Sequence, residues 1–347
     1  MFGTRANRDR GRSRKGAEGR VTAPAGSVHL HQDREGSVDG RAWEDAGIAV
    51  KKLACGAVLA LGIVGALGAS WSLLPIPREE GEEGVRSWIG AQLDTTDVRN
   101  DPRVGAFVEA YGPLIDSVTY TDDDVIFALG SRPIHFQGGR MLEEGRLDRG
   151  GDCDPIFYRY SLEPLTEPSP LPEENPTHCT DVLESLWGRT DHEIRAHGRS
   201  TTFLDHRMFV NNLLVDALAA VEEEILEAAT DNSSVATWIN ELNITYSMID
   251  REIAGSPTRS HHAWGMAVDL VPNSYEGLNV YWRWSRVYDE EGWHRIPVER
   301  RWSPPQTVIE IFESHGFIWG GKWAHFDNIH FEYRPEILLY NRVISNR

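Results

Sequence analysis

The stretch Ser260-His-His-Ala-Trp-Gly-Met-Ala-Val-Asp269 decides how the rest of the chain is interpreted. It holds the imidazole of His262 and the carboxylate of Asp269, two groups that bind zinc, and a catalytic zinc site commonly uses three protein ligands and leaves one position for water. The apolar, β-branched run 267–271 predicts a buried strand. Because side chains seven positions apart on a regular strand face opposite ways, we expect Gly265 to break the alternation and turn both groups toward one point. A third ligand must come from elsewhere in the chain.

A second polar cluster lies in residues 316–332, which read Gly-Phe-Ile-Trp-Gly-Gly-Lys-Trp-Ala-His-Phe-Asp-Asn-Ile-His-Phe-Glu. Asp327 and His330 stand three positions apart in it, just before Phe331. They add one imidazole and one carboxylate, which is the minimum that metal-assisted hydrolysis still requires: a further ligand, and a base that takes a proton from the attacking water. Taken alone, a core histidine and a strand-end aspartate would also explain the first segment, but the two segments together favour a metal site.

The two segments resemble the M15 zinc peptidases. This family includes D-alanyl-D-alanine carboxypeptidases, the vancomycin-resistance dipeptidases and the L-alanyl-D-glutamate endopeptidases of phage endolysins. The resemblance covers roughly residues 200–335, and a ten-residue motif with a correctly placed second half is specific. The matching pattern is Ser260-x-His262-x-x-Gly265-x-Ala267-x-Asp269, then Trp319-Gly320-Gly321-x-Trp323, then Asp327-x-x-His330.

The resemblance implies a role for each matching residue. The implied zinc ligands are His262, Asp269 and His330, and the implied catalytic acid/base is Asp327. The carboxypeptidase and dipeptidase branches usually have glutamate at that last position. Aspartate preceded by Trp-Gly-Gly is closer to the L-alanyl-D-glutamate branch, so the sequence leaves open which bond is cut.

The family also supplies an arginine upstream of the first ligand, which would stabilise the oxyanion. The candidates here are Arg251 and Arg259, and for either one an ordinary surface arginine is the alternative. His261 and His325 adjoin the implied site. A fourth protein ligand would close the site to water, so we expect both of these histidines to be neighbours of the ligands and not ligands themselves.

The charge of the chain excludes one class of partner. The 347 residues include 35 Lys and Arg against 53 Asp and Glu, a formal net charge of -18. Residues 1–52 are basic, so the remainder is more acidic than the whole. Binding to a phosphate backbone needs the opposite sign, and no nucleic-acid partner is expected. The length allows one large domain or two modest ones.

The amino-terminal part predicts a tail, a membrane segment and a linker. Residues 1–48, rich in Arg, Gly, Ser and Ala without periodicity, predict a disordered basic cytoplasmic tail. Residues 49–74 contain an uncharged apolar run long enough to span a bilayer, and the flanking charges place the amino terminus inside and the rest outside the cytoplasm. Residues 75–95 form an acidic linker. Because Ala66-Leu-Gly68 resembles a cleavage site, a cleaved signal peptide and secretion are the alternative.

Residues 96–200 predict an accessory β-rich region, and residues 201–347 the zinc peptidase catalytic domain. The accessory region shows no recognisable catalytic chemistry. Cys153 and Cys179 flank a proline-rich loop within it and would form a disulfide outside the cytoplasm, but two cysteines give no pattern that decides the pairing. Three short runs bounded by turn residues predict strands: 125–129, 134–136 and 156–160.

The catalytic region predicts helices around a small sheet. Apolar residues at helical spacing predict a core helix over 202–229, and a strand is expected at 244–248. A second helix is expected from a Ser303 cap to a stop at Gly316. The fold class is therefore α+β, a small antiparallel sheet with flanking helices carrying a single zinc site, preceded by a transmembrane segment and the β-rich region.

The sequence thus predicts a zinc metallopeptidase of the cell envelope. Its substrate would be a peptidoglycan stem peptide, its cofactor Zn²⁺, and its membrane contact a single amino-terminal helix, with the catalytic domain periplasmic or wall-facing. A monomer is expected. The alternatives are a D,D-carboxypeptidase or D-Ala-D-Ala dipeptidase in place of an L-Ala-D-Glu endopeptidase, and a non-catalytic wall-binding module on the same fold. The joint presence of ligands and base disfavours the last alternative.

Overall fold

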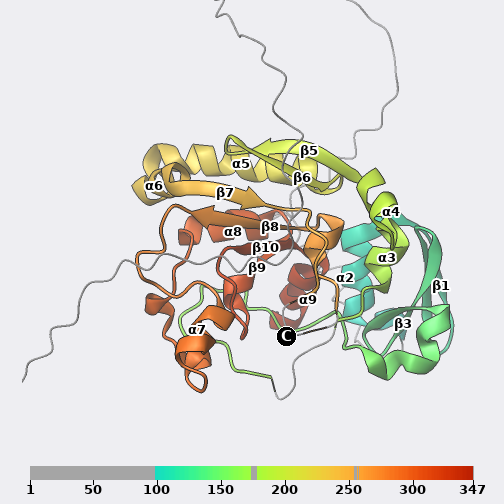
Figure 1. Cartoon of the computed structure of the whole chain (residues 1–347). Coiled ribbons are helices and arrows are strands. Elements are labelled where there is room, and N and C mark those ends of the chain that lie inside the picture. The colour runs from blue at the N-terminus through green and yellow to red at the C-terminus, as the bar shows by residue number, and fades with distance from the viewer. Residues whose placement is uncertain (1–97, 173–177, 254–255, 257, 347) are drawn as a thin grey trace, which may run out of the picture. The chain divides into compact units, whose positions relative to one another are not determined.

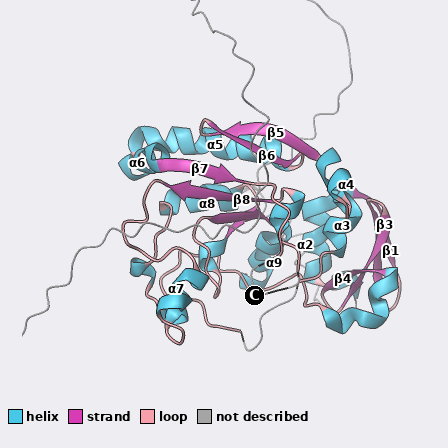
Figure 2. Cartoon of the chain, in the orientation of Figure 1, coloured by secondary structure: helices cyan, strands magenta, loops and turns pink. Residues whose placement is uncertain are grey.

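The computed structural model describes residues 98–172, 178–253, 256 and 258–346. Helices and small antiparallel sheets make up these residues, which confirms the α+β class (Figure 2). The tail, membrane segment and linker predicted for residues 1–48, 49–74 and 75–95 lie outside the described residues. Within the described part, no helix is long and apolar enough to cross a membrane.

The first sheet lies in the amino-terminal part of the described chain and is antiparallel throughout. The strands predicted at 125–129 and 134–136 are confirmed. Helix α2 (Pro102–Tyr111) packs on the sheet, with the Phe107 ring 5.0 Å from the ring of Phe127. Its strands, in spatial order, are β1 (Ile115–Tyr120), β2 (Val125–Leu129), β3 (Arg132–Gln137) and β4 (Arg140–Glu143).

The second sheet carries the residues of the sequence motif. Its strands, in spatial order, are β7 (Leu242–Tyr246), β8 (Ala267–Pro272), β10 (His330–Tyr333) and β9 (Phe317–Trp319), all antiparallel. Helices α5 (Leu214–Asp231), α6 (Ser233–Glu241) and α8 (Gln306–Ser314) accompany it (Figure 1). The ring of Phe331 on β10 stacks on Phe312 of α8 at 4.0 Å. Because neighbours on a strand face opposite ways, His330 and Glu332 point to the other side of the sheet.

The carboxy-terminal helix connects the second sheet to the amino-terminal part. Helix α9 (Pro335–Ser345) packs against α2, and Tyr111 Oη donates a 2.8 Å hydrogen bond to Glu336. Cys153 and Cys179 form a disulfide, which answers the question that their spacing left open. The boundary predicted at residue 200 stays a prediction. The remaining elements are α3 (Asp181–Trp187), α4 (Asp191–Ala196), β5 (Gly198–Phe203), β6 (His206–Asn211) and α7 (Trp282–Tyr288).

The helix predicted over 202–229 is wrong at its start. It begins at Leu214, and the residues before it belong to the β5–β6 hairpin. The two residues at the hairpin turn, Leu204 and Asp205, have φ values of 46° and 66°. Positive φ at both central positions fits the twist of a two-residue hairpin, but glycine or asparagine usually marks such a turn, and neither is present here.

Two further local predictions are wrong. Residues 156–160 form no strand. The amide of Tyr160 donates its hydrogen bond to the side-chain oxygen of Asn341, at 3.0 Å, and not to a neighbouring strand. Helix α8 begins without the predicted side-chain cap, since Ser303 Oγ donates to Pro304 O instead. The predicted stop is confirmed: Gly316, just beyond α8, has φ of +89°, a conformation that favours glycine.

Candidate metal centre

His262, Asp269 and His330 meet because two adjacent strands and one tight turn position them. Asp269 on β8 and His330 on β10 are directly paired across the ladder. His262 lies in the 3₁₀ turn His261–Trp264, and Gly265 follows with φ of +67° before β8 begins. A Cβ at Gly265 would stand 2.6 Å from the Asn211 amide nitrogen, so only glycine fits. The turn that the sequence predicted at this glycine is therefore present.

The three side chains form a compact, buried donor set. His262 Nε2 lies 3.0 Å from Asp269 Oδ1, His330 Nδ1 lies 2.9 Å from the same oxygen, and the two nitrogens are 3.1 Å apart. The exposed fractions are 0% for His262, 8% for Asp269 and 5% for His330. In the described part of the chain, these three residues form a group whose donor atoms lie close enough together to hold a metal ion. Two imidazoles and one carboxylate are a donor set that suits zinc and leaves room for a further ligand.

The electrostatics of this centre favour a cation. Burial lowers the pKa of His330, but the hydrogen bonds that the ring donates to Asp269 and Glu332 outweigh it and raise that pKa to about 10. The pKa of Asp269 is far below its ordinary value, because the neighbouring imidazoles overcome the effect of burial. The carboxylates around His330 thus stabilise positive charge at the point where the three donor atoms meet. That preference, together with the donor atoms, fits a divalent metal ion.

His262 is oriented by the backbone of the adjoining segment. Its Nδ1 lies 2.7 Å from the carbonyl oxygen of Ser247. A carbonyl can only accept, so Nδ1 carries the proton and donates it. The Nε2 lone pair is then free to face the donor set, which is the arrangement usual for metal-binding histidines.

Asp327 lies beside the donor set, at the end of the turn that follows β9. Its amide donates to Gly320 O at 3.1 Å, and a Cβ at Gly320 would stand 2.7 Å from the Asp327 carbonyl oxygen. Asp327 Oδ1 is shielded from solvent and has no hydrogen-bond partner within the described structure. Burial and then the negative charge of Asp269 raise the pKa of Asp327 to about 7. A carboxyl group with a pKa near neutrality can both accept and return a proton at physiological pH.

Residues 254–333 match the M15 family model described as D-alanyl-D-alanine carboxypeptidase. The match supports the M15 peptidase family for this part of the chain. The resemblance drawn from the motif is thereby confirmed, and the matched segment contains all three donor residues and Asp327. Searches among curated proteins and among solved structures find no match. The family assignment identifies a peptidase, and M15 enzymes are typically metallopeptidases.

The structure brings only one of the two candidate arginines to the M15 site. Arg251 Nη2 lies 3.8 Å from Asp269 Oδ2, and Arg251 lines the cavity that contains Asp327. Arg259 is turned away: it pairs with Asp250 at 2.7 Å and donates to the carbonyl oxygen of Arg189 at 2.8 Å. Of the two candidates, the geometry therefore places Arg251 beside the donor set.

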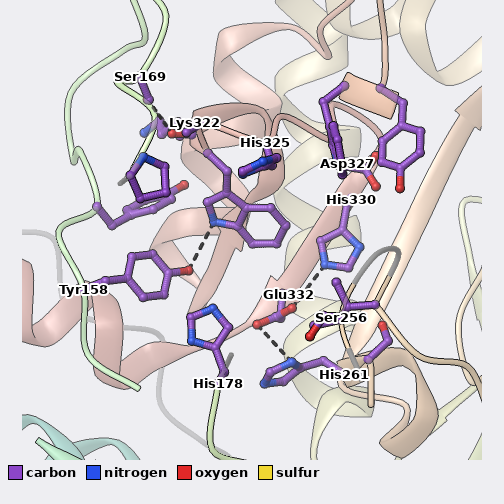
Figure 3. Close-up of a pocket in the computed structure, with 18 of the residues that line it drawn as sticks. Tyr158, Ser169, His178, Ser256, His261, Lys322, His325, Asp327, His330 and Glu332 are labelled. Carbon is purple, nitrogen blue, oxygen red and sulfur yellow. Dashed lines mark hydrogen bonds and ion pairs between the residues drawn. The ribbon is translucent and has the colours of Figure 1, made fainter. Parts of the chain in front are cut away.

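A cavity of about 1250 Å³ opens beside the donor set, and Asp327 and His330 line it (Figure 3). Aromatic side chains make up much of the wall, among them Tyr158, Trp282 and Trp323. His325, also in the wall, lies 4.6 Å from the Trp282 ring and outside the donor set. A cavity of this size accommodates a peptide of several residues. Its lining residues come from 154–172, from His178, from 251–253, 256 and 260–261, and from 281–290 and 322–334.

One wall of the M15 cavity comes from residues 154–172, which we call the crossing segment. Trp323 Nε1 donates to Tyr158 Oη at 3.1 Å, and the amide of Tyr160 donates to Asn341 Oδ1 at 3.0 Å. These bonds fix the crossing segment against the second sheet and α9. A region in which the sequence showed no catalytic chemistry therefore helps to shape the site.

Proposed function

We propose that this chain is a zinc-dependent peptidase that hydrolyses an amide bond in peptidoglycan stem peptides. One observation carries the proposal: the buried donor set of His262, Asp269 and His330 shares a peptide-sized cavity with Asp327, whose pKa is raised to about 7. The family match supports peptidase chemistry, and the donor set supports zinc.

In this mechanism the ligand set of His262, Asp269 and His330 would hold the zinc, which supplies Lewis-acid polarisation of the scissile carbonyl and of the attacking water. Asp327 takes the proton of that water on Oδ1, the oxygen that has no other partner within the described structure. It then returns the proton to the amine that leaves. Arg251 offers a positive charge on the same side of the cavity, where negative charge develops on the carbonyl oxygen.

The bond that is cut has two candidates within this chemistry. The description of the matching family model favours a D,D-carboxypeptidase. Aspartate at position 327, following Trp319-Gly-Gly, favours an L-alanyl-D-glutamate endopeptidase by its resemblance to that branch. A D-Ala-D-Ala dipeptidase would cut the same bond as the carboxypeptidase, but in the free dipeptide, so its product must also be distinguished.

Mass spectrometry of muropeptides tests the proposal. Muropeptides are incubated with zinc and the chain from residue 80 onward, with an EDTA-treated sample as the control. Loss of a single terminal D-alanine identifies a carboxypeptidase, and release of a peptide that begins at D-glutamate identifies the endopeptidase. Cleavage of free D-Ala-D-Ala identifies a dipeptidase. Absence of any metal-dependent product would refute the proposed hydrolysis and favour a wall-binding module.

We also propose that the catalytic part works outside the cytoplasm, anchored by residues 49–74. The disulfide between Cys153 and Cys179 supports this location, because disulfides persist in oxidising compartments. Fractionation of cells that express the full chain, followed by protease treatment of intact spheroplasts, tests it. A membrane-bound chain that the protease removes is expected, a chain released to the medium indicates cleavage, and a protected cytosolic chain would contradict the proposal.

A further inference from the structure

We propose that Glu332 is a positioning residue of the metal centre, which fixes the ring of His330 and links this ligand to the amino-terminal part of the chain. The inference rests on the proposed zinc function and adds to it a residue that does not contact the metal position itself. Glu332 lies two positions after His330 on β10, so both side chains point to the same side of the sheet.

The contact between the two side chains sets the tautomer of His330. His330 Nε2 lies 3.2 Å from Glu332 Oε2, while His330 Nδ1 faces Asp269 and His262. Both residues are buried, with 5% and 6% of their surface exposed. A histidine that binds a metal does so as a neutral imidazole with one proton, and a carboxylate can only accept that proton. With a metal bound, the proton of His330 therefore stays on Nε2 toward Glu332, and the Nδ1 lone pair is directed at the metal position.

Glu332 is itself held by a chain of buried contacts. Its Oε1 lies 3.1 Å from Arg334 Nη1 and 3.3 Å from His261 Nδ1 (Figure 3 shows the His261 contact). Arg334 also donates to the carbonyl oxygen of Ile156 in the crossing segment at 2.8 Å and pairs with Glu336. Arg334 lies between the carboxylates of Glu332 and Glu336, so the Glu332 carboxylate is fixed in place.

The far end of this chain reaches the amino-terminal part. Glu336 accepts a hydrogen bond from the hydroxyl of Tyr111, the last residue of helix α2. The metal ligand His330 is thus connected to α2 and to the crossing segment through Glu332 and Arg334. The accessory region, in which the sequence showed no chemistry, thereby supports a metal ligand as well as a cavity wall.

Another buried carboxylate of this part of the fold provides a matched control. Glu313 is 9% exposed and pairs with Lys322 at 2.6 Å, but it contacts none of the three donor residues. Glu313→Gln removes a buried, paired charge as Glu332→Gln does. Any difference between the two variants in zinc binding therefore reports on the contact with His330.

The test measures zinc affinity directly, by competition with a chromophoric chelator, in the wild-type chain and both variants. E332Q is expected to bind zinc about 10- to 100-fold more weakly, as is typical when the hydrogen-bond partner of a metal-binding histidine is removed. E313Q is expected to bind zinc as the wild type does. The absorption spectrum of the cobalt-substituted chain should shift in E332Q alone, because the ligand geometry changes.

Unchanged zinc affinity in E332Q, or an equal loss in E332Q and E313Q, would overturn the inference while leaving the proposed function standing. Failure of the wild-type chain to bind zinc would instead refute the proposed function, and the inference with it. If E332Q does not fold, Glu332→Asp replaces it: the shorter side chain keeps the charge but withdraws it from His330. A weaker zinc affinity in that variant supports the inference, and an unchanged one overturns it.

Discussion

Two buried clusters of charge adjoin the second sheet, and they differ in how completely they are paired. In one, Glu313 pairs with Lys322 at 2.6 Å and also accepts a hydrogen bond from the hydroxyl of Tyr160. In the other, the metal centre, Asp269 faces two imidazoles, and Asp327 has a shielded oxygen without a partner within the described structure. The first cluster is complete as it stands, whereas the second keeps groups that a cation and a proton would satisfy.

The difference separates a structural ion pair from a reactive site. An unpaired buried carboxyl destabilises a fold, so chains retain one mainly where its chemistry is used. Here the pKa of Asp327 is raised to about 7. Breaking each cluster in turn should therefore have opposite consequences: loss of function without loss of fold at the metal centre, and loss of stability without loss of zinc at the complete pair.

The largest effect is expected from removing a metal ligand. His262→Ala or His330→Ala takes one of three donors away, so zinc binding and hydrolysis should both fall by orders of magnitude. Metal content measured by inductively coupled plasma mass spectrometry checks this. His325→Ala is the matched control, because His325 lines the same cavity but lies outside the donor set and should leave zinc stoichiometric. Stoichiometric zinc in either ligand variant would contradict that residue's role.

Replacement of Asp327 should separate metal binding from catalysis. Asp327→Asn keeps the size of the side chain but not its ability to take a proton, so zinc should stay bound while kcat/KM falls by about 10²- to 10⁴-fold. A base that must be ionised predicts a rate that declines as the pH falls, with a midpoint below the metal-free pKa of about 7, because the zinc charge favours the carboxylate. That acidic decline should be absent from the residual activity of D327N. Full activity in D327N would refute the acid/base assignment.

The residues that carry this contrast were only partly predictable from sequence. The resemblance to the M15 motif singled out His262, Asp269, Asp327 and His330, and the structure brings the three proposed ligands among them together. Gly265 was also predictable, since two ligands seven apart need a break in the strand. The turn at Gly265 depends on near neighbours and is present, whereas the meeting of His262 and Asp269 with His330 depends on the pairing of β8 with β10.

The supporting parts of the site were not predictable, because their partners are distant in sequence. The crossing segment takes its position from Asn341 and Trp323, 181 and 165 residues away from Tyr160 and Tyr158. No periodicity in residues 154–172 encodes such bonds. Glu332 did leave a local signal: it lies two positions after a predicted ligand on a strand, and a search for polar residues on the same strand face would have found it.

Breaking the complete pair should reduce stability instead of function. Lys322→Met leaves Glu313 buried without its cation, which typically costs about 3–5 kcal/mol of unfolding free energy. Urea unfolding followed by tryptophan fluorescence measures the loss, and zinc content should be unchanged. Adding Glu313→Gln to K322M should recover part of the stability, because no charge then remains unpaired. A K322M chain as stable as the wild type would show that the pair contributes nothing.

The effect that tests the comparison most directly is the stability of the metal-free chain when Asp327 is replaced. The folded pKa of about 7 lies above the ordinary value of 3.8, so the folded state resists ionisation of this carboxyl while the unfolded state does not. Ionisation therefore opposes folding: stability falls as the pH rises from about 4 to about 7, and the full cost is present above that range. D327N, which cannot ionise, should be more stable than the wild type at about pH 8 in EDTA, by at most about 4 kcal/mol, and the gain should shrink toward about pH 4. The pKa of about 7 already includes the opposing effects of His330 and Arg251. Thermal unfolding at the two pH values measures it. If D327N is no more stable at the higher pH, Asp327 is not held at a cost to the fold; if it is more stable and inactive, the chain keeps this carboxylate for its chemistry.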